Sequence, residues 1–146
     1  MNSAPSSRTR ILFVCTENAC RSQIAEAFAR ALGRGTVEVW SAGSRPRGTM
    51  DDAARVVMAE EGLMLLHHRS KGLETLPAIE WDVLVTMGCG EECPALPAKR
   101  RLDWAIPDPK GKPLDEYRAV RDKIRVSVAE LLDKRRAPSA STVVGR

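Results

Sequence analysis

Short, unbroken apolar runs alternate along this chain with segments in which apolar residues recur every three or four positions. The run at residues 11–14 (Ile-Leu-Phe-Val) predicts a strand that is buried on both faces of a parallel sheet. Residues 22–32 have the apolar spacing of a helix, and Gly33 is placed to end that helix. This alternation of strand and helix predicts an α/β fold and excludes an all-helical one.

The same alternation continues along the chain. The elements that we expect are a strand at residues 37–40, a helix that is capped by Asp51 or Asp52 and ends at Gly62, a short strand at 63–66, a strand at 82–87, a further strand-like segment at 101–106, and a closing helix with an apolar stripe of Tyr117, Val120, Ile124, Val128 and Leu131. Residues 1–8 and 137–146 contain serines and proline without apolar periodicity, so both are expected to be flexible tails. A single domain at residues 9–136 suits a chain of 146 residues, which is long enough for one core and too short for two ordinary ones.

The composition excludes several classes of protein. Lys and Arg outnumber Asp and Glu by 23 to 19, but the basic residues are scattered apart from short clusters at 99–101 and 134–136, and aromatic residues make up only 4%. We therefore expect solvated basic faces and no nucleic-acid partner. No apolar run approaches the roughly 18–20 residues of a membrane span, and the run at 11–14 is too short for a signal peptide. The expectation is a cytoplasmic domain with no membrane partner and a preference for an anionic ligand.

The four cysteines form two close pairs, Cys15 with Cys20 and Cys89 with Cys93. Without an export signal they should be thiols at rest, which leaves a metal site, a redox or nucleophilic apparatus, or inert buried residues. Zinc is the least favoured, because the chain's two histidines lie away from both pairs and Cys15 closes a strand. We expect no metal site and no bound cofactor.

The segment from Cys15 to Ser22, here called the anion loop, links the first predicted strand to the first predicted helix. Ligands of open parallel sheets bind outside the carboxyl ends of the strands. Backbone N–H groups and the positive end of the helix suit a tetrahedral oxyanion there, and the same donors favour the thiolate form of a cysteine. The candidate nucleophile is Cys15, and the substrate-binding candidates are Thr16, Glu17, Asn18, Ala19, Cys20, Arg21 and Ser22. Of these, Arg21 can grip two oxygens of the anion.

Two further reactive residues follow predicted strands. Cys89 comes after residues 82–87, and Asp108 comes after residues 101–106. Because the carboxyl ends of parallel strands meet at one edge of the sheet, Cys15, Cys89 and Asp108 are expected to share one site.

The motifs of this site resemble a known family over about residues 10–135. Residues 14–23, the tripeptide Ser41-Ala42-Gly43 and the dipeptide Asp108-Pro109 resemble the low-molecular-weight tyrosine phosphatase superfamily. Within it, residues 86–94, Trp104 and residues 108–112 are similar to the arsenate reductases that are coupled to thioredoxin. The resemblance implies a four-stranded parallel sheet flanked by helices on both faces.

The resemblance also implies that arsenate is reduced to arsenite by a relay of cysteines. In this relay Cys15 attacks arsenate, Cys89 attacks Cys15 and releases arsenite, and Cys93 attacks Cys89 to leave a Cys89–Cys93 disulfide. Asp108 is the implied general acid. Thiols reduce arsenic(V) but not phosphorus(V), so arsenate is the expected substrate, and phosphate and sulfate are expected to bind as mimics. An external thiol reductant restores the enzyme, with thioredoxin favoured over glutaredoxin or a small-molecule thiol.

Two alternatives stay open. A protein tyrosine phosphatase would use Cys15, Arg21 and Asp108, but here Asp108-Pro109 is followed by Lys110-Gly111 instead of an aromatic pair. A phosphatase would also leave the second cysteine pair without a task. A non-catalytic oxyanion sensor would need the anion loop for binding only.

Other residues receive more modest expectations. Cys20 is expected to be structural, with protection of Cys15 as the alternative, and Asn18 to hold the shape of the anion loop. Lys71 is expected to be a surface lysine, with a positive charge near the loop as the alternative, and the histidines receive no role. Glu17 stands where many members of the family carry a small residue, and a carboxylate there would repel an oxyanion unless it pointed to solvent.

Overall fold

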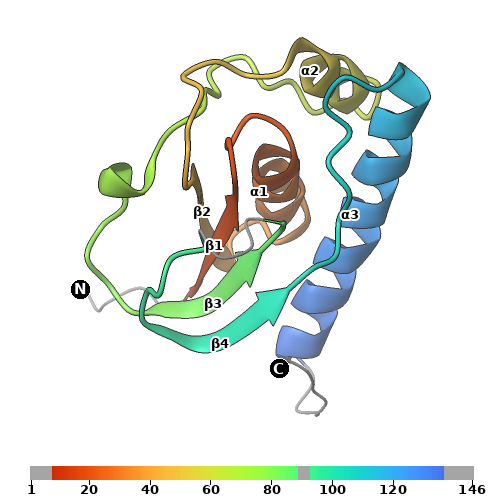
Figure 1. Cartoon of the computed structure of the whole chain (residues 1–146). Coiled ribbons are helices and arrows are strands. Elements are labelled where there is room, and N and C mark those ends of the chain that lie inside the picture. Colours follow the sequence, from red (N-terminus) through yellow and green to blue (C-terminus); the bar gives the residue numbers. More distant parts are fainter. Residues whose placement is uncertain (1–7, 89–92, 137–146) are drawn as a thin grey trace.

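The computed structural model describes residues 8–88 and 93–136 and contains a four-stranded parallel sheet with helices (Figure 1). The strands are β1 (Thr9–Cys15), β2 (Val37–Gly43), β3 (Trp81–Thr86) and β4 (Ala98–Asp103), in the order β2-β1-β3-β4. The helices are α1 (Arg21–Leu32), α2 (Asp52–Ala59), α3 (Leu114–Arg136) and the short 3-10 helix η1 (Leu73–Thr75). None of the helices in these described ranges is both long and apolar enough to cross a membrane.

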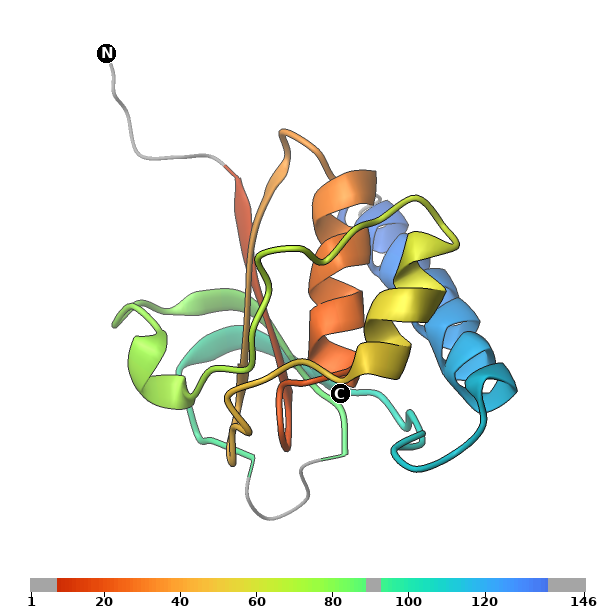
Figure 2. The same cartoon turned by 90° about the horizontal axis from the view of Figure 1, so that it is seen from above.

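The three α-helices cover one face of the sheet (Figure 2). Alternate residues of β1, such as Phe13, point into this first core, where Ile24 of α1 and Ile124 of α3 are fully buried. The opposite residues of β1, such as Leu12, point into a smaller second core around Trp81. This second core is covered by partly buried residues of loops that flank β3 and β4, among them Leu76, Ile79, Cys93 and Leu96.

The expectation of helices on both faces therefore needs a correction for the described residues. Apart from the 3-10 helix η1, α-helices lie on one face only. The physical reason lies in residues 60–80, which connect α2 to β3. Gly62, Gly72 and Pro77 interrupt this segment, so it crosses the second face without forming a long helix.

Most predicted elements are present, with two differences. Residues 63–66 are not a strand, because the segment has no partner in the sheet, although its burial alternates as in a strand, with Leu65 buried between exposed Met64 and Leu66. The last strand runs from Ala98 to Asp103 instead of covering residues 101–106. It is an edge strand with mostly exposed side chains, so it carries little apolar signal.

Several expectations fall outside the described ranges. The predicted tails are among them, apart from residue 8, and so is Cys89, whereas Cys93 is described.

Candidate active site

The centre of the sheet brings together the carboxyl ends of β1 and β3. The chain leaves β1 toward β2 on one side, and β3 leads to β4 on the other, which makes this edge a topological switch point. Val14 is in register with Thr86, and the Met87 N–H donates to the Val14 carbonyl at 2.8 Å. Cys15 and Gly88 therefore leave the sheet at the same edge, as the strand pattern predicts.

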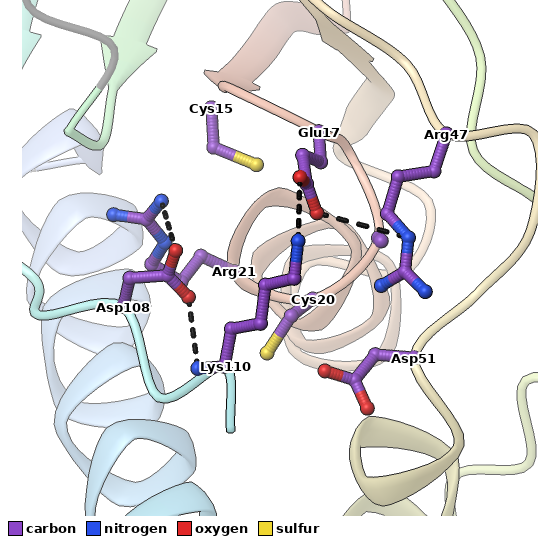
Figure 3. Close-up of a pocket in the computed structure, with 9 residues that line it drawn as sticks. Cys15, Glu17, Cys20, Arg21, Arg47, Asp51, Asp108 and Lys110 are labelled. Atoms are coloured by element: carbon purple, nitrogen blue, oxygen red, sulfur yellow. Dashed lines mark hydrogen bonds and ion pairs between the residues drawn. The ribbon is translucent and has the colours of Figure 1, made fainter. Parts of the chain in front are cut away.

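A small cavity lies at this edge (Figure 3). The centre of a water molecule can move through about 20 Å³ of it, and the space around that centre is larger. The residues that line it are Cys15, Glu17, Ala19, Cys20, Arg21, Arg47, Asp51, Asp108 and Lys110. Four of the seven predicted binding residues are in this lining, and the remaining three, Thr16, Asn18 and Ser22, are not. Arg47, Asp51 and Lys110 were missed by the sequence analysis, because they belong to loops that only the fold brings to the anion loop.

A directed chain of hydrogen bonds ends at the sulfur of Cys15. The Asn18 amide Nδ2 donates to Ser22 Oγ at 2.7 Å, and Ser22 Oγ lies 3.0 Å from Cys15 Sγ. Because the serine oxygen already accepts from Asn18, its own hydrogen is available to the sulfur. A thiolate accepts such a hydrogen bond and gains stability from it. Ser22 and Asn18 thus act on the Cys15 sulfur through hydrogen bonds, although neither residue lines the cavity.

Asn18 is fixed in a left-handed backbone conformation, with a φ of 54°, and is fully buried. Asparagine tolerates this conformation better than most residues. Its Oδ1 accepts from the backbone N–H of Lys71 at 3.0 Å and from Gln23 Nε2 at 2.8 Å. These donors orient the amide, so Nδ2 must face Ser22 and Ser41. The geometry is the shape-holding one expected for Asn18.

The expectation of a surface Lys71 is wrong. Lys71 Nζ donates to Ser41 Oγ at 3.0 Å and lies 3.7 Å from the Glu26 carboxylate, and the Ser41 hydroxyl donates to that carboxylate at 2.5 Å. Burial lowers the pKa of Lys71, partly offset by Glu26. The lysine therefore places a positive charge beneath the anion loop, and the alternative interpretation is the correct one.

Arg21 is held from two directions. Its Nη1 donates to the carbonyl of Ile106 at 3.1 Å, and its Nη2 lies 3.6 Å from the Asp108 carboxylate. Arg21 is only 6% exposed, whereas the Asp108 side chain is 52% exposed. Asp108 Oδ1 also accepts from the Lys110 N–H at 3.0 Å. Asp108 is thus a turn residue and a cavity residue at once.

The chain that approaches Cys89 lies against this arginine. Gly88 has a φ of 82°, and a Cβ atom there would lie 2.3 Å from Arg21 Nη1. The Thr16 hydroxyl donates to the Gly88 carbonyl at 3.5 Å. Glycine at this position avoids both the strain of a positive φ and a clash with the guanidinium of Arg21.

A second glycine explains the motif Ser41-Ala42-Gly43. Gly43 is in register with Cys15, and a Cβ atom there would lie 2.7 Å from the Thr16 carbonyl oxygen. After Gly43, the N–H groups of Ser44 and Arg45 donate to the carbonyls of Cys15 and Thr16 at 3.2 and 2.7 Å. The end of β2 therefore packs against the start of the anion loop and is hydrogen-bonded to it.

Cys15 and Cys20 are both free thiols in the structure. Cys20 is the residue before α1, and its side chain makes no capping hydrogen bond. Burial first, and then the Asp51 carboxylate, raise the pKa of Cys20 far above its usual range. At neutral pH Cys20 is therefore a protonated thiol, which is a poor nucleophile.

Glu17 does not point away to solvent. Its carboxylate lies 2.8 Å from Lys110 Nζ and 3.8 Å from Arg47 Nε (Figure 3). The two histidines are not cavity residues: His67 is exposed, and His68 Nδ1 lies 2.7 Å from Gln23 Oε1. Within residues 8–88 and 93–136, no group of three or more His, Cys, Asp or Glu side chains could hold a metal ion.

Known proteins are similar to this chain in sequence and in fold. Residues 10–140 match the low molecular weight phosphotyrosine protein phosphatase family. A relative from Synechocystis sp., named glutaredoxin arsenate reductase, is 34% identical over 128 residues, which are 86% of this chain and 97% of the relative. Among solved structures, an arsenate reductase in the phosphate binding state has a TM-score of 0.78 and 33% identity, covering 86% of this chain and 98% of that one.

A second solved structure extends the comparison. The thioredoxin-dependent arsenate reductase of Corynebacterium glutamicum has a TM-score of 0.74 and 30% identity, covering 90% of this chain and 63% of that one. In sequence, in the parallel sheet and in the loop that presents Cys15 and Arg21, this chain belongs to the low molecular weight phosphotyrosine protein phosphatase family.

Proposed function

We propose that the protein reduces arsenate to arsenite through its cysteines. The observation that carries this proposal is the convergence of Cys15, Arg21 and Asp108 on one small cavity at the edge where β3 leads toward Cys89. The relatives named arsenate reductase support the same conclusion. The cavity suits a tetrahedral oxyanion, because Arg21 and the start of α1 lie beside the nucleophile.

In the first step, the Cys15 thiolate attacks arsenic(V), and an arsenate oxygen leaves as water after protonation by Asp108. This step forms a sulfur–arsenic bond without a change of oxidation state. The Cys89 thiolate then attacks the Cys15 sulfur, and the electron pair of the sulfur–arsenic bond passes to arsenic, which leaves as arsenite. The Cys93 thiolate attacks Cys89, frees Cys15 and forms the Cys89–Cys93 disulfide. A dithiol reductant then supplies the two electrons that reopen this disulfide.

Two observations support the later steps of the relay. The Gly88 backbone lies against Arg21, so the chain reaches position 89 from the rim of the site. Cys93 is disulfide-bonded in the structure. Cys89 lies outside the described residues, so its role rests on the sequence and on the relatives.

The reductant is proposed to be of the thioredoxin type. The relatives' names point to two donors, glutaredoxin for the Synechocystis protein and thioredoxin for the Corynebacterium protein. Both are dithiol proteins that attack a disulfide by the same exchange. A relay that returns to free thiols suits the reducing cytoplasm, which is the proposed location.

The phosphatase alternative is not favoured. It would use Cys15, Arg21 and Asp108 in the same cavity, but it gives Cys93 no task. The segment after Asp108 offers Lys110, an ionic side chain, where a wall for an aromatic ring would be needed.

Arsenate turnover with thioredoxin, thioredoxin reductase and NADPH tests the proposal, run beside hydrolysis of para-nitrophenyl phosphate. We expect Cys15→Ser, Cys89→Ser and Cys93→Ser to abolish sustained turnover and Cys20→Ser to retain most of it. In a single turnover, the Cys93→Ser protein should release about one equivalent of arsenite and keep a Cys15–Cys89 disulfide, detected by mass spectrometry. Steady ester hydrolysis without either disulfide would replace the reductase with the phosphatase.

A further inference from the structure

An ion pair crosses the mouth of the cavity. Glu17 comes from the anion loop, and Lys110 comes from the segment between β4 and α3, 93 residues later. Figure 3 shows the Lys110 side chain reaching to the Glu17 carboxylate, with Cys15, Arg21 and Asp108 on one side of it and Arg47 and Asp51 on the other.

The pair lies at the surface and the nucleophile lies beneath it. The side chains of Lys110 and Glu17 are 54% and 32% exposed, whereas Cys15 is 2% exposed. A group attached to an oxyanion bound at Cys15 that leaves on this side of the cavity would meet these two side chains. A free tetrahedral oxyanion has no such group.

Glu17 is fixed on its other sides. Its backbone carbonyl accepts from the Ser70 hydroxyl at 2.6 Å, and its carboxylate also faces Arg47 at 3.8 Å. Ser70 in turn accepts from the Arg47 N–H at 2.7 Å, so the β2–α2 loop and the segment before η1 hold the base of Glu17 in place. Lys110 is the more mobile partner, because its long side chain is mostly exposed.

The charges of the lining reinforce this arrangement. Among the described residues that line the cavity, Arg21, Arg47 and Lys110 are cationic, and Glu17, Asp51 and Asp108 are acidic. Glu17 thus neutralises two cations that would otherwise attract anions of every kind to the mouth. A repulsive group such as the Glu17 carboxylate makes a site specific when it weakens the binding of competing anions more than that of the substrate.

We propose that the Glu17–Lys110 ion pair is a selectivity clamp, which admits a free tetrahedral oxyanion to Cys15 and excludes phosphate and arsenate monoesters. The proposal rests on the proposed function for the oxyanion site itself. Exposed ion pairs are weak, so a small dianion can draw Lys110 away from Glu17. An aryl ester that leaves on this side would also have to displace the Glu17 side chain, whose backbone is held by Ser70 and whose carboxylate faces Arg47.

The test compares two ligands of one site, inorganic phosphate and phenylphosphonate, through the concentration of each that half-protects Cys15 from iodoacetamide. In Glu17→Ala, we expect phenylphosphonate to gain about tenfold over phosphate relative to the wild type. Glu17→Gln keeps the size of the side chain and loses its charge, so it should give a smaller gain in the same direction. Lys110→Ala opens the clamp from an exposed loop and should also shift the ratio toward phenylphosphonate. Glu130→Ala, which removes an exposed carboxylate of α3, is the control for net charge.

A ratio within about twofold of the wild type in both Glu17→Ala and Lys110→Ala would overturn the clamp. So would an equal gain in affinity for both ligands, which would reduce Glu17 to a general source of repulsion. The proposed function is tested separately by arsenate turnover of the wild type. A wild type that reduces no arsenate would contradict that function, and the ligand ratio would still decide on the clamp.

Discussion

At the scale of single residues, Ser22 is in hydrogen-bond contact with the sulfur of Cys15. Its hydroxyl is 3.0 Å from the sulfur, and Asn18 occupies its acceptor site. We predict that Ser22→Ala slows the alkylation of Cys15 by iodoacetamide about tenfold, the rate equivalent of losing about 1.4 kcal/mol from a hydrogen bond to a charged sulfur. Alkylation rates at fixed pH, followed by mass spectrometry, measure the effect.

The control is Ser127→Ala, which removes a hydroxyl from α3 away from the cavity lining. Equal alkylation rates in the two variants would mean that the Asn18–Ser22 chain does not act on the thiolate.

Site residues that lie in one continuous segment could be predicted from the sequence. Site residues that meet only because the fold brings distant segments together could not. Cys15 and Arg21 stand at the end of an apolar run and the start of a helical pattern, so their common loop is visible in the sequence. Lys71 meets Ser41 and Asn18 across 30 and 53 residues. No spacing or periodicity in the chain encodes such contacts, and a lone lysine between polar residues suggests only a surface.

The segment after β3 depends on Gly88 for its path. Gly88→Ala would place a methyl group 2.3 Å from Arg21 Nη1 at a φ of 82°. We predict that it weakens the protection of Cys15 by phosphate and lowers the free energy of unfolding by more than the roughly 1 kcal/mol cost of alanine at a positive φ. Urea unfolding and protected alkylation measure the two effects.

Gly111→Ala is the matched control for backbone strain. Gly111 has a φ of 80° and no atom within 4 Å of the added methyl group. It should lose about 1 kcal/mol of stability and keep phosphate protection. If both variants protected Cys15 equally well, the contact between position 88 and Arg21 would have no bearing on the anion site.

The elements that the sequence predicts well are those with buried, uninterrupted apolar faces. β1 is buried over residues 11–15, and α1 is buried at every position from Arg21 to Ala29, so both contain apolar residues in a clear pattern. β4 lies at the sheet edge with Lys99, Arg100 and Arg101 exposed, and its bounds were therefore displaced. Residues 63–66 are a short apolar run, but β2 and β4 form the edges of the sheet and neither pairs with this segment. A short apolar run without a partner strand does not form a strand.

At the scale of the whole molecule, an ion-pair network joins α2 to α3. Glu60, just after α2, accepts from Arg118 and from Arg121 of α3, each at 2.8 Å. Hydrogen bonds from Arg118, and then from Arg121, lower the pKa of Glu60 from its ordinary value of 4.5 to about 2. A carboxylate whose pKa is lowered in the folded state stabilises that state above its unfolded pKa. This contribution is lost as the pH falls from about 4.5 toward about 2.

We predict that Glu60→Gln is less stable than the wild type at pH 7 and that the difference shrinks as the pH falls below 4.5. Urea midpoints at pH 7, 5 and 3.5 measure it, and added salt should reduce the difference at pH 7 because the network is exposed. Asp52→Asn, at the other end of α2, is the control. A difference that stays constant from pH 7 to pH 3.5 would contradict the role of the Glu60 charge.

The two unequal cores of the sheet give the protein a built-in optical reporter. Trp81 is 1% exposed and meets Trp40 edge-on at 5.1 Å between ring centroids, and Cys93 packs against the same second core. Trp104 lies apart, against Phe13 of the first core. An indole ring emits according to the polarity and the quenchers around it, so reduction and release of Cys93 should change the emission of the Trp40–Trp81 pair. In a Trp104→Phe protein, the intrinsic fluorescence would then follow the thiol–disulfide state of the relay in real time, without an added dye.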